Sequence, residues 1–133
     1  MSRYVIDASA ASEYLLRTPL GLKLAGILAD ATLLAPELLD VEVLSVLRRA
    51  VLRGELSDQR AVLALADLVD WSVDRIPHLP LLRVAWQHRN NVSAYDAIYV
   101  AAARIANATL LTTDGPLSRA PSLGITIENI KLS

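Results

Sequence analysis

Short apolar runs alternate with amphipathic segments along the whole chain. Five short runs predict β-strands, and six segments with apolar residues at spacings of three and four predict helices. The predicted strands are residues 4–6, 32–35, 71–76, 109–112 and 125–127, and the predicted helices are residues 10–17, 20–29, 36–53, 57–69, 80–89 and 93–106.

Several predicted helices begin or end at residues suited to a helix end. Pro36 fits the first turn of the third helix, and Gly54 follows its last residue, where glycine commonly stops a helix. Ser57 and Ser93 stand where a side-chain oxygen can cap the helix that follows, and Pro80 opens another. These residues support the helix boundaries.

Strands that alternate with helices imply parallel pairing, with helices on both faces of the sheet. We therefore expect a single domain, residues 1–133, with a three-layer α/β/α fold and a central, mostly parallel sheet of four to five strands. Ligands collect at the carboxyl ends of the strands in such sheets. Asp7 and Asp114 each follow a predicted strand directly, so both are expected at that edge.

The composition indicates a globular chain that binds a partner through apolar surface. Of the 133 residues 53% are hydrophobic and 20% charged, which excludes a disordered chain and leaves apolar surface for an oligomer or a bound peptide. No apolar run approaches the roughly 18 to 20 residues needed to span a bilayer. Asp7 interrupts the amino terminus before a signal-peptide core could form, so we expect a soluble, cytoplasmic protein.

The chain has no cysteine, which excludes disulfides, thiolate zinc sites and thiol nucleophiles. His78 and His88 are too few for a histidine-rich metal centre, and we expect both to be structural or exposed to solvent. Any metal must then be a hard cation bound by oxygen, such as Mg²⁺ or Mn²⁺.

The formal charge of −1 does not by itself suggest a nucleic-acid ligand. If four carboxylates are neutralised by bound metal, however, the remaining 13 basic and 10 acidic residues leave a charge of +3, and 11 of the bases are arginine. Arginine offers planar, bidentate donors suited to phosphate. The candidates for this role are Arg48, Arg49, Arg53, Arg83 and Arg89.

Four carboxylates in apolar or strand-ending surroundings are the main candidates for chemistry: Asp7, Glu42, Asp96 and Asp114. Each has an ordinary structural explanation, since aspartate caps helices and is common in turns such as the one predicted at residues 114–116. Together, however, they could converge on a metal ion. Magnesium bound by carboxylates can polarise a phosphodiester and lower the pKa of an attacking water.

Asp40 is a rival to Glu42 in the same predicted helix. Glu42 has Leu38 and Val46 one turn away on either side, so it borders an apolar stripe. Asp40 shares its side with Leu44. Helical periodicity does not choose between the two acids.

In their order and context, these motifs resemble the PIN domain, specifically the VapC-type ribonuclease toxins of bacterial and archaeal toxin–antitoxin pairs. YVIDAS, at Asp7, is similar to the strand-Asp-x-Ser opening of the family, and APELLDVEVLSVLRR to its second motif, in which Glu42 is the functional acid. SAYDAIYVAAA matches the third motif at Asp96, and LLTTD the fourth at Asp114. The resemblance covers essentially the whole chain and selects Glu42 over Asp40.

The resemblance implies a metal site and its ligands. Asp7, Asp96 and Asp114 would hold one Mg²⁺, with Mn²⁺ as a substitute, and Glu42 would position a water. Many relatives carry a further acid after the fourth motif, but residues 115–118 of this chain contain none, so one firmly bound ion is expected and a second would arrive only with substrate.

The resemblance also gives two hydroxyl residues a part in the site. Ser9 and Thr112 would hydrogen-bond the metal-binding carboxylates. Both have structural alternatives, since Ser9 can cap a helix and Thr112 can simply end a strand.

The activity that the resemblance implies is Mg²⁺-dependent cleavage of RNA by water, leaving a 5′-phosphate and a 3′-hydroxyl. The implied partners are the RNA substrate, a VapB-type antitoxin held by the leucine-rich residues 15–28, and a second copy in a homodimer that assembles further with antitoxin. Four aromatic residues are expected in the core or an interface: Trp71, Trp86, Tyr95 and Tyr99.

Two other functions compete with this hypothesis. A phosphate-receiving signalling domain needs an adjacent acidic pair after the first strand and a late lysine at the site, but Asp7 has no acidic neighbour and the chain's lysines are Lys23 and Lys131. A non-cleaving PIN-like module that binds RNA or protein would have no need to keep mutually repelling carboxylates together. We therefore favour the nuclease.

Overall fold

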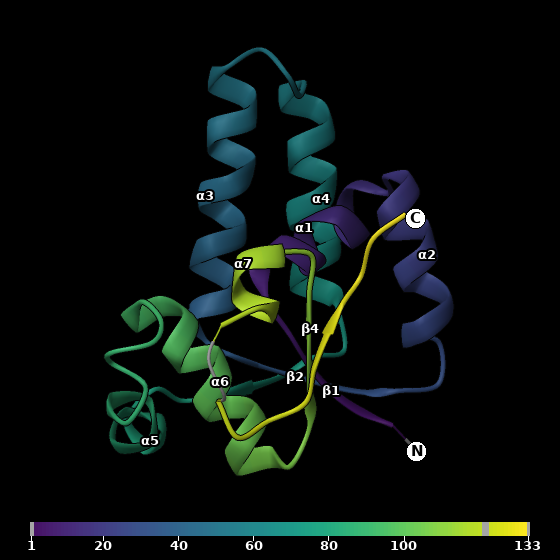
Figure 1. Cartoon of the computed structure of the whole chain (residues 1–133). Helices are drawn as coiled ribbons and strands as arrows, with labels where there is room; N and C mark the ends of the chain where they lie inside the picture. The colour runs from purple at the N-terminus through teal and green to yellow at the C-terminus, as the bar shows by residue number, and fades with distance from the viewer. Residues whose placement is uncertain (1, 121–122, 133) are drawn as a thin grey trace.

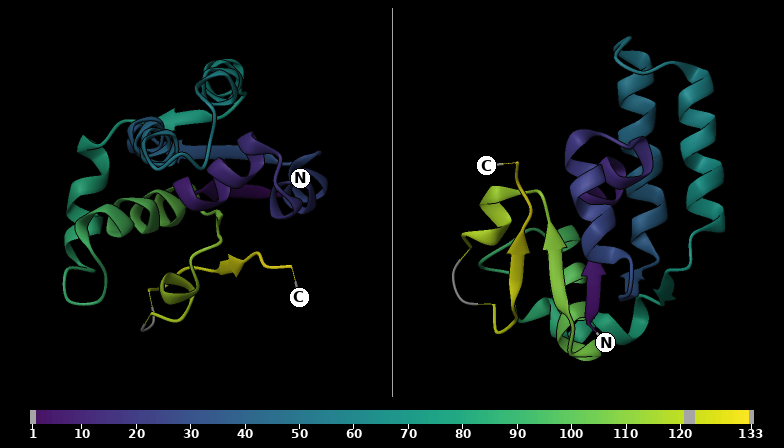
Figure 2. Two further views of the ribbon diagram at one scale, coloured as in Figure 1. Left: turned by 90° about the horizontal axis from the view of Figure 1, so that it is seen from above. Right: turned by 90° about the vertical axis from the view of Figure 1, so that its right-hand side faces the viewer.

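A five-stranded parallel sheet forms the centre of the molecule, in the order β3-β2-β1-β4-β5. The computed structural model describes residues 2–120 and 123–132. Every pair of neighbouring strands is parallel, as the arrows of β1, β4 and β5 show in the right-hand view of Figure 2, so the predicted sheet is confirmed with five strands. The strands are β1 (Arg3–Ile6), β2 (Thr32–Pro36), β3 (Asp74–Ile76), β4 (Thr109–Thr112) and β5 (Ile127–Asn129).

Helices cover both faces of the sheet, which confirms the three-layer α/β/α architecture. The chain moves outward from β1 to β3 through α1–α4 and then returns to β4 through α5 and α6, and right-handed crossovers place these two sets on opposite faces (Figures 1 and 2). The helices are α1 (Ala8–Leu16), α2 (Pro19–Leu28), α3 (Leu38–Leu52), α4 (Asp58–Asp70), the 3₁₀ turn η1 (Leu79–Leu81), α5 (Leu82–Trp86), α6 (Ala94–Ala106) and α7 (Gly115–Ser118).

The core lies where the middle strands meet α1 and α6. Val5 and Ile6 of β1 are fully buried, as is Leu110 of β4. Helix α6 packs on β1, β2 and β4 through small residues, and Ala101 and Ala102 are completely buried. Small side chains let the helix approach the sheet closely, so the first turn of α6 is fixed relative to the ends of β1 and β4.

Local interactions explain why several elements differ from the sequence prediction. Helix α1 begins at Ala8, two residues early, because Asp7 caps it through the backbone N–H of Ala10. The turn predicted at residues 114–116 instead opens α7, which Asp114 caps. Pro36 ends β2 and is not in the first turn of α3. In each case the boundary of an element is shifted by a helix cap or by hydrogen bonding within the sheet.

The remaining differences concern edge strands and one helix. Strand β3 is only Asp74–Ile76, half the predicted run, and β5 is displaced to Ile127–Asn129. The helix predicted over residues 80–89 is a 3₁₀ turn followed by the short α5, with hydrogen-bonded turns after Trp86. Edge strands pair on one side only, so the apolar pattern constrains them weakly. None of the helices in the described parts of the chain is long and apolar enough to cross a membrane.

Helices α1 and α2 pack closely because of one glycine. A Cβ atom at Gly21 of α2 would lie 1.9 Å from the carbonyl oxygen of Glu13 in α1. Any larger residue would push the two helices apart. On the same layer, α3 and α4 form a hairpin that extends beyond the carboxyl ends of the strands (Figure 1).

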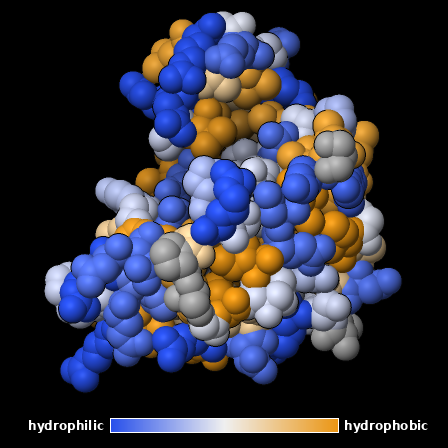
Figure 3. All heavy atoms as spheres, in the orientation of Figure 1, coloured by the Kyte–Doolittle hydropathy of each residue, from blue (hydrophilic) through white to orange (hydrophobic). Residues whose placement is uncertain are grey.

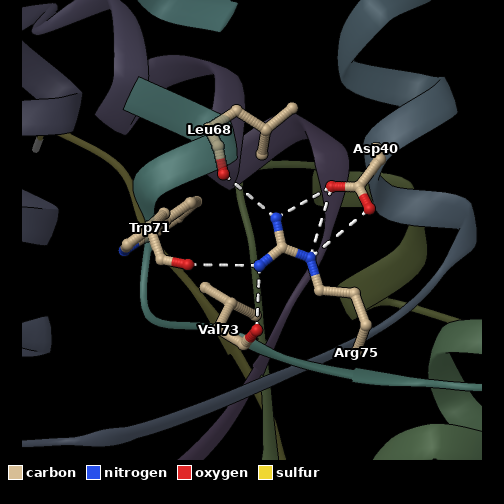
Figure 4. Close-up of polar contacts among 5 residues, drawn as sticks. All are labelled: Asp40, Leu68, Trp71, Val73 and Arg75. Atoms are coloured by element: carbon tan, nitrogen blue, oxygen red, sulfur yellow. Dashed lines mark hydrogen bonds and ion pairs between the residues drawn. The ribbon is translucent and has the colours of Figure 1, made fainter. Parts of the chain in front are cut away.

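Arg75 of β3 ties this hairpin to the sheet (Figure 4). Its Nη2 donates to Asp40 Oδ1 at 2.9 Å and to the Leu68 carbonyl at 3.1 Å, and its Nη1 donates to the carbonyls of Trp71 and Val73 at 3.2 and 2.8 Å. One guanidinium therefore joins the first turn of α3, the end of α4 and the loop into β3. This network holds α3 at a fixed angle to the sheet.

Replacing Arg75 is expected to destabilise the protein more than replacing Asp40. Arg75→Ala removes a donor from each of three partly buried carbonyls, although those of Leu68 and Trp71 keep a backbone N–H donor, and should lower the free energy of unfolding by about 3 kcal/mol. The Asp40 side chain is 43% exposed, so Asp40→Ala should cost only about 1 kcal/mol. Urea unfolding of both variants measures the difference. Equal losses would show that the ion pair, and not the carbonyl bonds, carries the stability.

Candidate functional site

All four predicted acids come from elements that meet at the carboxyl edge of the sheet. Asp7 follows β1 and Asp114 closely follows β4, and these strands are neighbours, with Ile6 paired to Leu111. Asp96 lies in the first turn of α6, which packs on both strands. Glu42 lies in α3, two turns from the end of β2. Segments far apart in the sequence thus converge here.

Asp7 is the most buried of the four, with a side chain only 6% exposed. Its Oδ1 accepts hydrogen bonds from the Ser9 hydroxyl at 2.7 Å and from the backbone N–H of Ala10 at 3.0 Å. Burial raises the pKa of Asp7 to about 6, the hydrogen bonds oppose this rise, and the charge of Asp114 adds to it. Asp7 is therefore an acid whose negative charge is poorly compensated by the protein.

The hydroxyls of Ser9 and Thr112 link the ends of β1 and β4. Ser9 Oγ lies 3.3 Å from Thr112 Oγ1 and accepts from the backbone N–H of Thr113 at 3.0 Å. Thr112 Oγ1, which is fully buried, accepts from the N–H of Asp114 at 2.9 Å. A hydrogen bond from Thr112 also lowers the pKa of Asp7. The two residues named from the sequence are thus in one network with both aspartates.

Asp96 is half-buried and also carries a raised pKa. Burial is the main cause, the charge of Asp114 is the second, and a hydrogen bond involving Ser93 opposes both. Ser93 caps α6 by accepting from the Asp96 backbone N–H at 3.1 Å, as the sequence predicts. The Asp114 charge therefore acts on both Asp7 and Asp96, which makes these three carboxylates a coupled group.

The structure separates Glu42 from Asp40, which helical periodicity could not do. Asp40 is engaged by Arg75 in the network that holds the hairpin. Glu42 faces the hydroxyl of Tyr99. Burial is the main cause of the raised pKa of the Tyr99 phenol, the interaction with Glu42 is the second, and the charges of Asp7 and Asp40 add to it. Asp40 thus has a structural role, whereas Glu42 lies beside the Tyr99 hydroxyl, on which the charge of Asp7 also acts.

Tyr99 is the site residue that sequence reasoning missed, because it was assigned only to the core or an interface. It is indeed buried, at 2% exposure, but its hydroxyl has no hydrogen bond of ordinary geometry and lies among the acids. A signal was present in the sequence. Tyr99 is three residues after Asp96, which puts both on one face of α6.

The two histidines lie outside this group. His78 Nε2 accepts from the backbone N–H of Leu38 at 2.8 Å, which is a structural contact at the start of α3. His88 is buried, and burial lowers its pKa, with the charge of Arg104 adding to the effect. Neither contributes an imidazole to the acids.

The acids are coupled, but they are not assembled into a ready metal cage. Among residues 2–120 and 123–132, no three acidic or histidine side chains stand close enough together to hold a metal ion as they are placed. Asp7 and Asp96, whose pKa values are raised by burial and then by the charge of Asp114, nevertheless form with it an anionic site that favours a cation or a proton. The arrangement can therefore bind positive charge at the sheet edge.

Comparison with known proteins identifies the family of this chain. A model of the PIN domain matches residues 4–123. The chain belongs to the PIN-domain family. Ribonuclease VapC1 of Mycobacterium tuberculosis (strain ATCC 25618 / H37Rv) is 41% identical over 134 residues, covering 98% of this chain and all of the relative. Ribonuclease VapC12 of the same strain is 36% identical and covers 93% of this chain and 96% of the relative. These relatives place the chain in the VapC group of PIN domains.

A solved structure supports the fold independently. VapBC2 from Rickettsia felis, crystallised with a DNA fragment from its promoter, contains a chain that superposes with a TM-score of 0.67. The match covers 97% of this PIN domain and 99% of that chain, at 16% sequence identity. At this identity the likeness establishes the shared fold.

The raised pKa of Asp7 predicts how stability changes with pH in the metal-free protein. Its folded pKa of about 6 exceeds the ordinary aspartate value of 3.8, so the folded state binds this proton more tightly, and stability falls as pH rises from about 4 to about 6. Asp7→Asn should remove this fall and stabilise the protein at pH 8, by at most about 3 kcal/mol.

Thermal unfolding at pH 4 and pH 8 in the presence of a chelator measures this effect. Asp30→Asn, at an exposed position before β2, is the matched control and should leave the pH dependence of wild type unchanged. A variant at Asp7 that keeps the wild-type slope would show that the charge of Asp7 is well compensated.

Proposed function

We propose that this PIN domain is a Mg²⁺-dependent endoribonuclease, the toxin of a toxin–antitoxin pair. The observation that carries the proposal is the position of Asp7, Asp96 and Asp114 at the carboxyl edge of β1 and β4, where the charge of Asp114 adds to the raised pKa values of the other two. The names of the VapC relatives as ribonucleases support the activity on RNA.

The donor set fits a hard divalent cation. Carboxylates are ligands that Mg²⁺ and Mn²⁺ accept, and neither a thiolate nor an imidazole belongs to the site. The raised pKa values of Asp7 and Asp96 show charges that a cation would stabilise. Asp7, Asp96 and Asp114 would hold the ion, and their side chains would move closer together than they stand now.

Individual residues of the chain would then have separate roles in hydrolysis. A bound Mg²⁺ would polarise the phosphodiester and make a water molecule more acidic. Glu42 would orient that water for attack on phosphorus, leaving a 5′-phosphate and a 3′-hydroxyl. Ser9 and the N–H of Ala10 fix the rotamer of Asp7, so the ligand is presented in one direction.

Three variants test the assignment of the acids. Asp96→Asn and Glu42→Gln should lower the rate of RNA cleavage in Mg²⁺ by about a hundredfold or more, because each removes several kcal/mol of transition-state stabilisation. Asp40→Asn is the matched control on the same helix as Glu42 and should cleave at close to the wild-type rate. Gel analysis of the products with a chelator control measures all three.

The results separate the proposal from its rival. Full activity of Asp96→Asn, or loss of activity only in Asp40→Asn, would overturn the site assignment. If calorimetry detected no binding of Mg²⁺ or Mn²⁺ to wild type and no RNA were cleaved, the protein would be a non-cleaving PIN module.

We also propose that the antitoxin binds in a cavity between α1, α2 and α4. The cavity has a volume of about 510 Å³ and is lined by Leu15, Leu22 and Ala25, within the leucine-rich segment singled out in the sequence, and by Trp71. Leu22 is 64% exposed, and hydrophobic side chains gather over α2 in Figure 3. Such a cavity suits an apolar face of a partner helix.

A charged residue in this cavity should prevent antitoxin binding without affecting the acids. The partner to test is a small protein encoded next to this gene, co-expressed with the tagged PIN domain. Leu22→Asp should abolish co-purification and relieve inhibition of RNA cleavage. Ile105→Asp, at an exposed position on α6, should still co-purify with the antitoxin and still be inhibited by it. Normal co-purification with Leu22→Asp would place the antitoxin elsewhere.

A further inference from the structure

The hydroxyl of Tyr99 is buried in the core without a hydrogen bond of ordinary geometry. The residue is only 2% exposed, and its oxygen is one of the buried polar atoms in the described parts of the chain that lack a partner. A buried hydroxyl with an unmade hydrogen bond is costly, and phenylalanine would fill the same space with the ring alone. The oxygen as it is placed does not stabilise the core, so its role must be sought in the site beside it.

Packing around the Tyr99 ring sets the position of this oxygen. Helix α6 packs on β1, β2 and β4, and the neighbours Val100, Ala102 and Ala103 are buried along with Tyr99. Side chains in so dense an interior keep few rotamers. The hydroxyl is therefore held at one place, one turn of α6 from Asp96 and on the same face of the helix.

Glu42 of α3 is the acid that the Tyr99 hydroxyl meets. After burial, interaction with Glu42 is the next cause of the raised pKa of the Tyr99 phenol, ahead of the charges of Asp7 and Asp40. Within residues 2–120 and 123–132, no other side chain or backbone group forms a hydrogen bond or ion pair with the Glu42 carboxylate. Glu42 and Tyr99 are thus each other's available partner.

A glutamate that orients a water molecule must itself be held in one direction. Glutamate has a long, flexible side chain, and ordering it costs conformational entropy. Asp7 is held by the Ser9 hydroxyl and the N–H of Ala10, but Glu42 has no such bonds. A phenol hydroxyl can donate one hydrogen bond, and bonds to an ionised acceptor are the strong ones. Tyr99 can therefore do for Glu42 what Ser9 does for Asp7.

We propose that Tyr99 is a positioning residue, whose hydroxyl donates a hydrogen bond to the Glu42 carboxylate and fixes its direction. The half-buried Glu42 side chain rotates to complete the bond, because the Tyr99 ring is fixed by packing. This inference rests on the proposed function, since it explains how the residue that orients the attacking water is itself held. Tyr99 acts through Glu42 and not on RNA or the metal ion.

Tyr99→Phe removes the hydroxyl and keeps the ring. The kcat for RNA cleavage in Mg²⁺ should fall about tenfold with little change in KM, as expected when a group that orients a site residue is lost. The midpoint of thermal unfolding should stay the same or rise, because a buried hydroxyl without a full partner is removed. A residue with only a structural role would show the reverse, lower stability at unchanged kcat.

Tyr4→Phe is the matched control, because Tyr4 lies near the amino end of β1, at the edge of the sheet opposite the acids. It should leave kcat unchanged. Wild-type kcat in Tyr99→Phe would overturn the proposal, and so would an equal loss of kcat in Tyr4→Phe.

A double-mutant cycle shows whether Tyr99 acts through Glu42. Cleavage is measured with enzyme in excess over RNA, so that slow variants can be compared. In the Glu42→Ala background, Tyr99→Phe should lower the rate less than about twofold, because the side chain that it holds is already absent. A further tenfold loss in that background would show that the hydroxyl acts independently of Glu42.

The hydrogen bond can also be observed by proton NMR without RNA or Mg²⁺. A buried phenol proton donated to a carboxylate exchanges slowly with water and resonates downfield, so wild type should give a signal that Tyr99→Phe removes. Glu42→Gln keeps the shape of the side chain but not its charge, and the signal should move upfield. Asp40→Asn, the matched control on the same helix, should leave it in place. An unmoved signal in Glu42→Gln, or no signal that depends on Tyr99, would exclude the bond.

The outcomes distinguish this inference from the proposed function. If wild type cleaved no RNA but the signal of Tyr99 responded to Glu42→Gln, the hydrogen bond would stand and the nuclease assignment would fail. If wild type cleaved RNA and Tyr99→Phe kept the wild-type kcat, the nuclease would stand and the positioning role would fail.

Discussion

The burial of one carboxylate at the end of the central strand is the constraint on which the site depends. Asp7 ends β1, caps α1 through the N–H of Ala10 and accepts from the Ser9 hydroxyl. One side chain thus caps the first turn of α1 and accepts from Ser9, whose hydroxyl lies 3.3 Å from Thr112 Oγ1 at the end of β4. Hydrogen bonds within the fold set the rotamer of Asp7, so its carboxylate is already oriented before a metal ion binds.

This arrangement stabilises the site's geometry at the expense of the fold's stability. The pKa values of Asp7 and Asp96 are raised by burial first and by the charge of Asp114 second, so ionisation of both opposes folding near neutral pH. The packed alanines of α6 and the Arg75 network offset this cost elsewhere. Poorly compensated charge inside a well-packed frame is typical of sites that bind cations.

The layers of the fold, and the position of Asp7 and Asp114 at the carboxyl edge of the sheet, could be predicted from the sequence, because both follow from short-range patterns and the rules of parallel sheets. It could not choose between Glu42 and Asp40 from periodicity, since the deciding partner, Arg75, is 35 residues from Asp40. It also could not choose between the core and an interface for Trp86 and Tyr95, which the structure exposes. Whether an aromatic ring is covered depends on tertiary neighbours that local spacing does not reveal.

Helix α1 connects the acids to the cavity proposed for the antitoxin. Its amino end is capped by Asp7, and Tyr14 and Leu15 at its other end line that cavity. Nine residues of helix span only about 13 Å. A partner that displaced α1 would therefore move the residues that hold the Asp7 rotamer. The proposed antitoxin would then act on the acids by changing the position of the Asp7 carboxylate, without covering them.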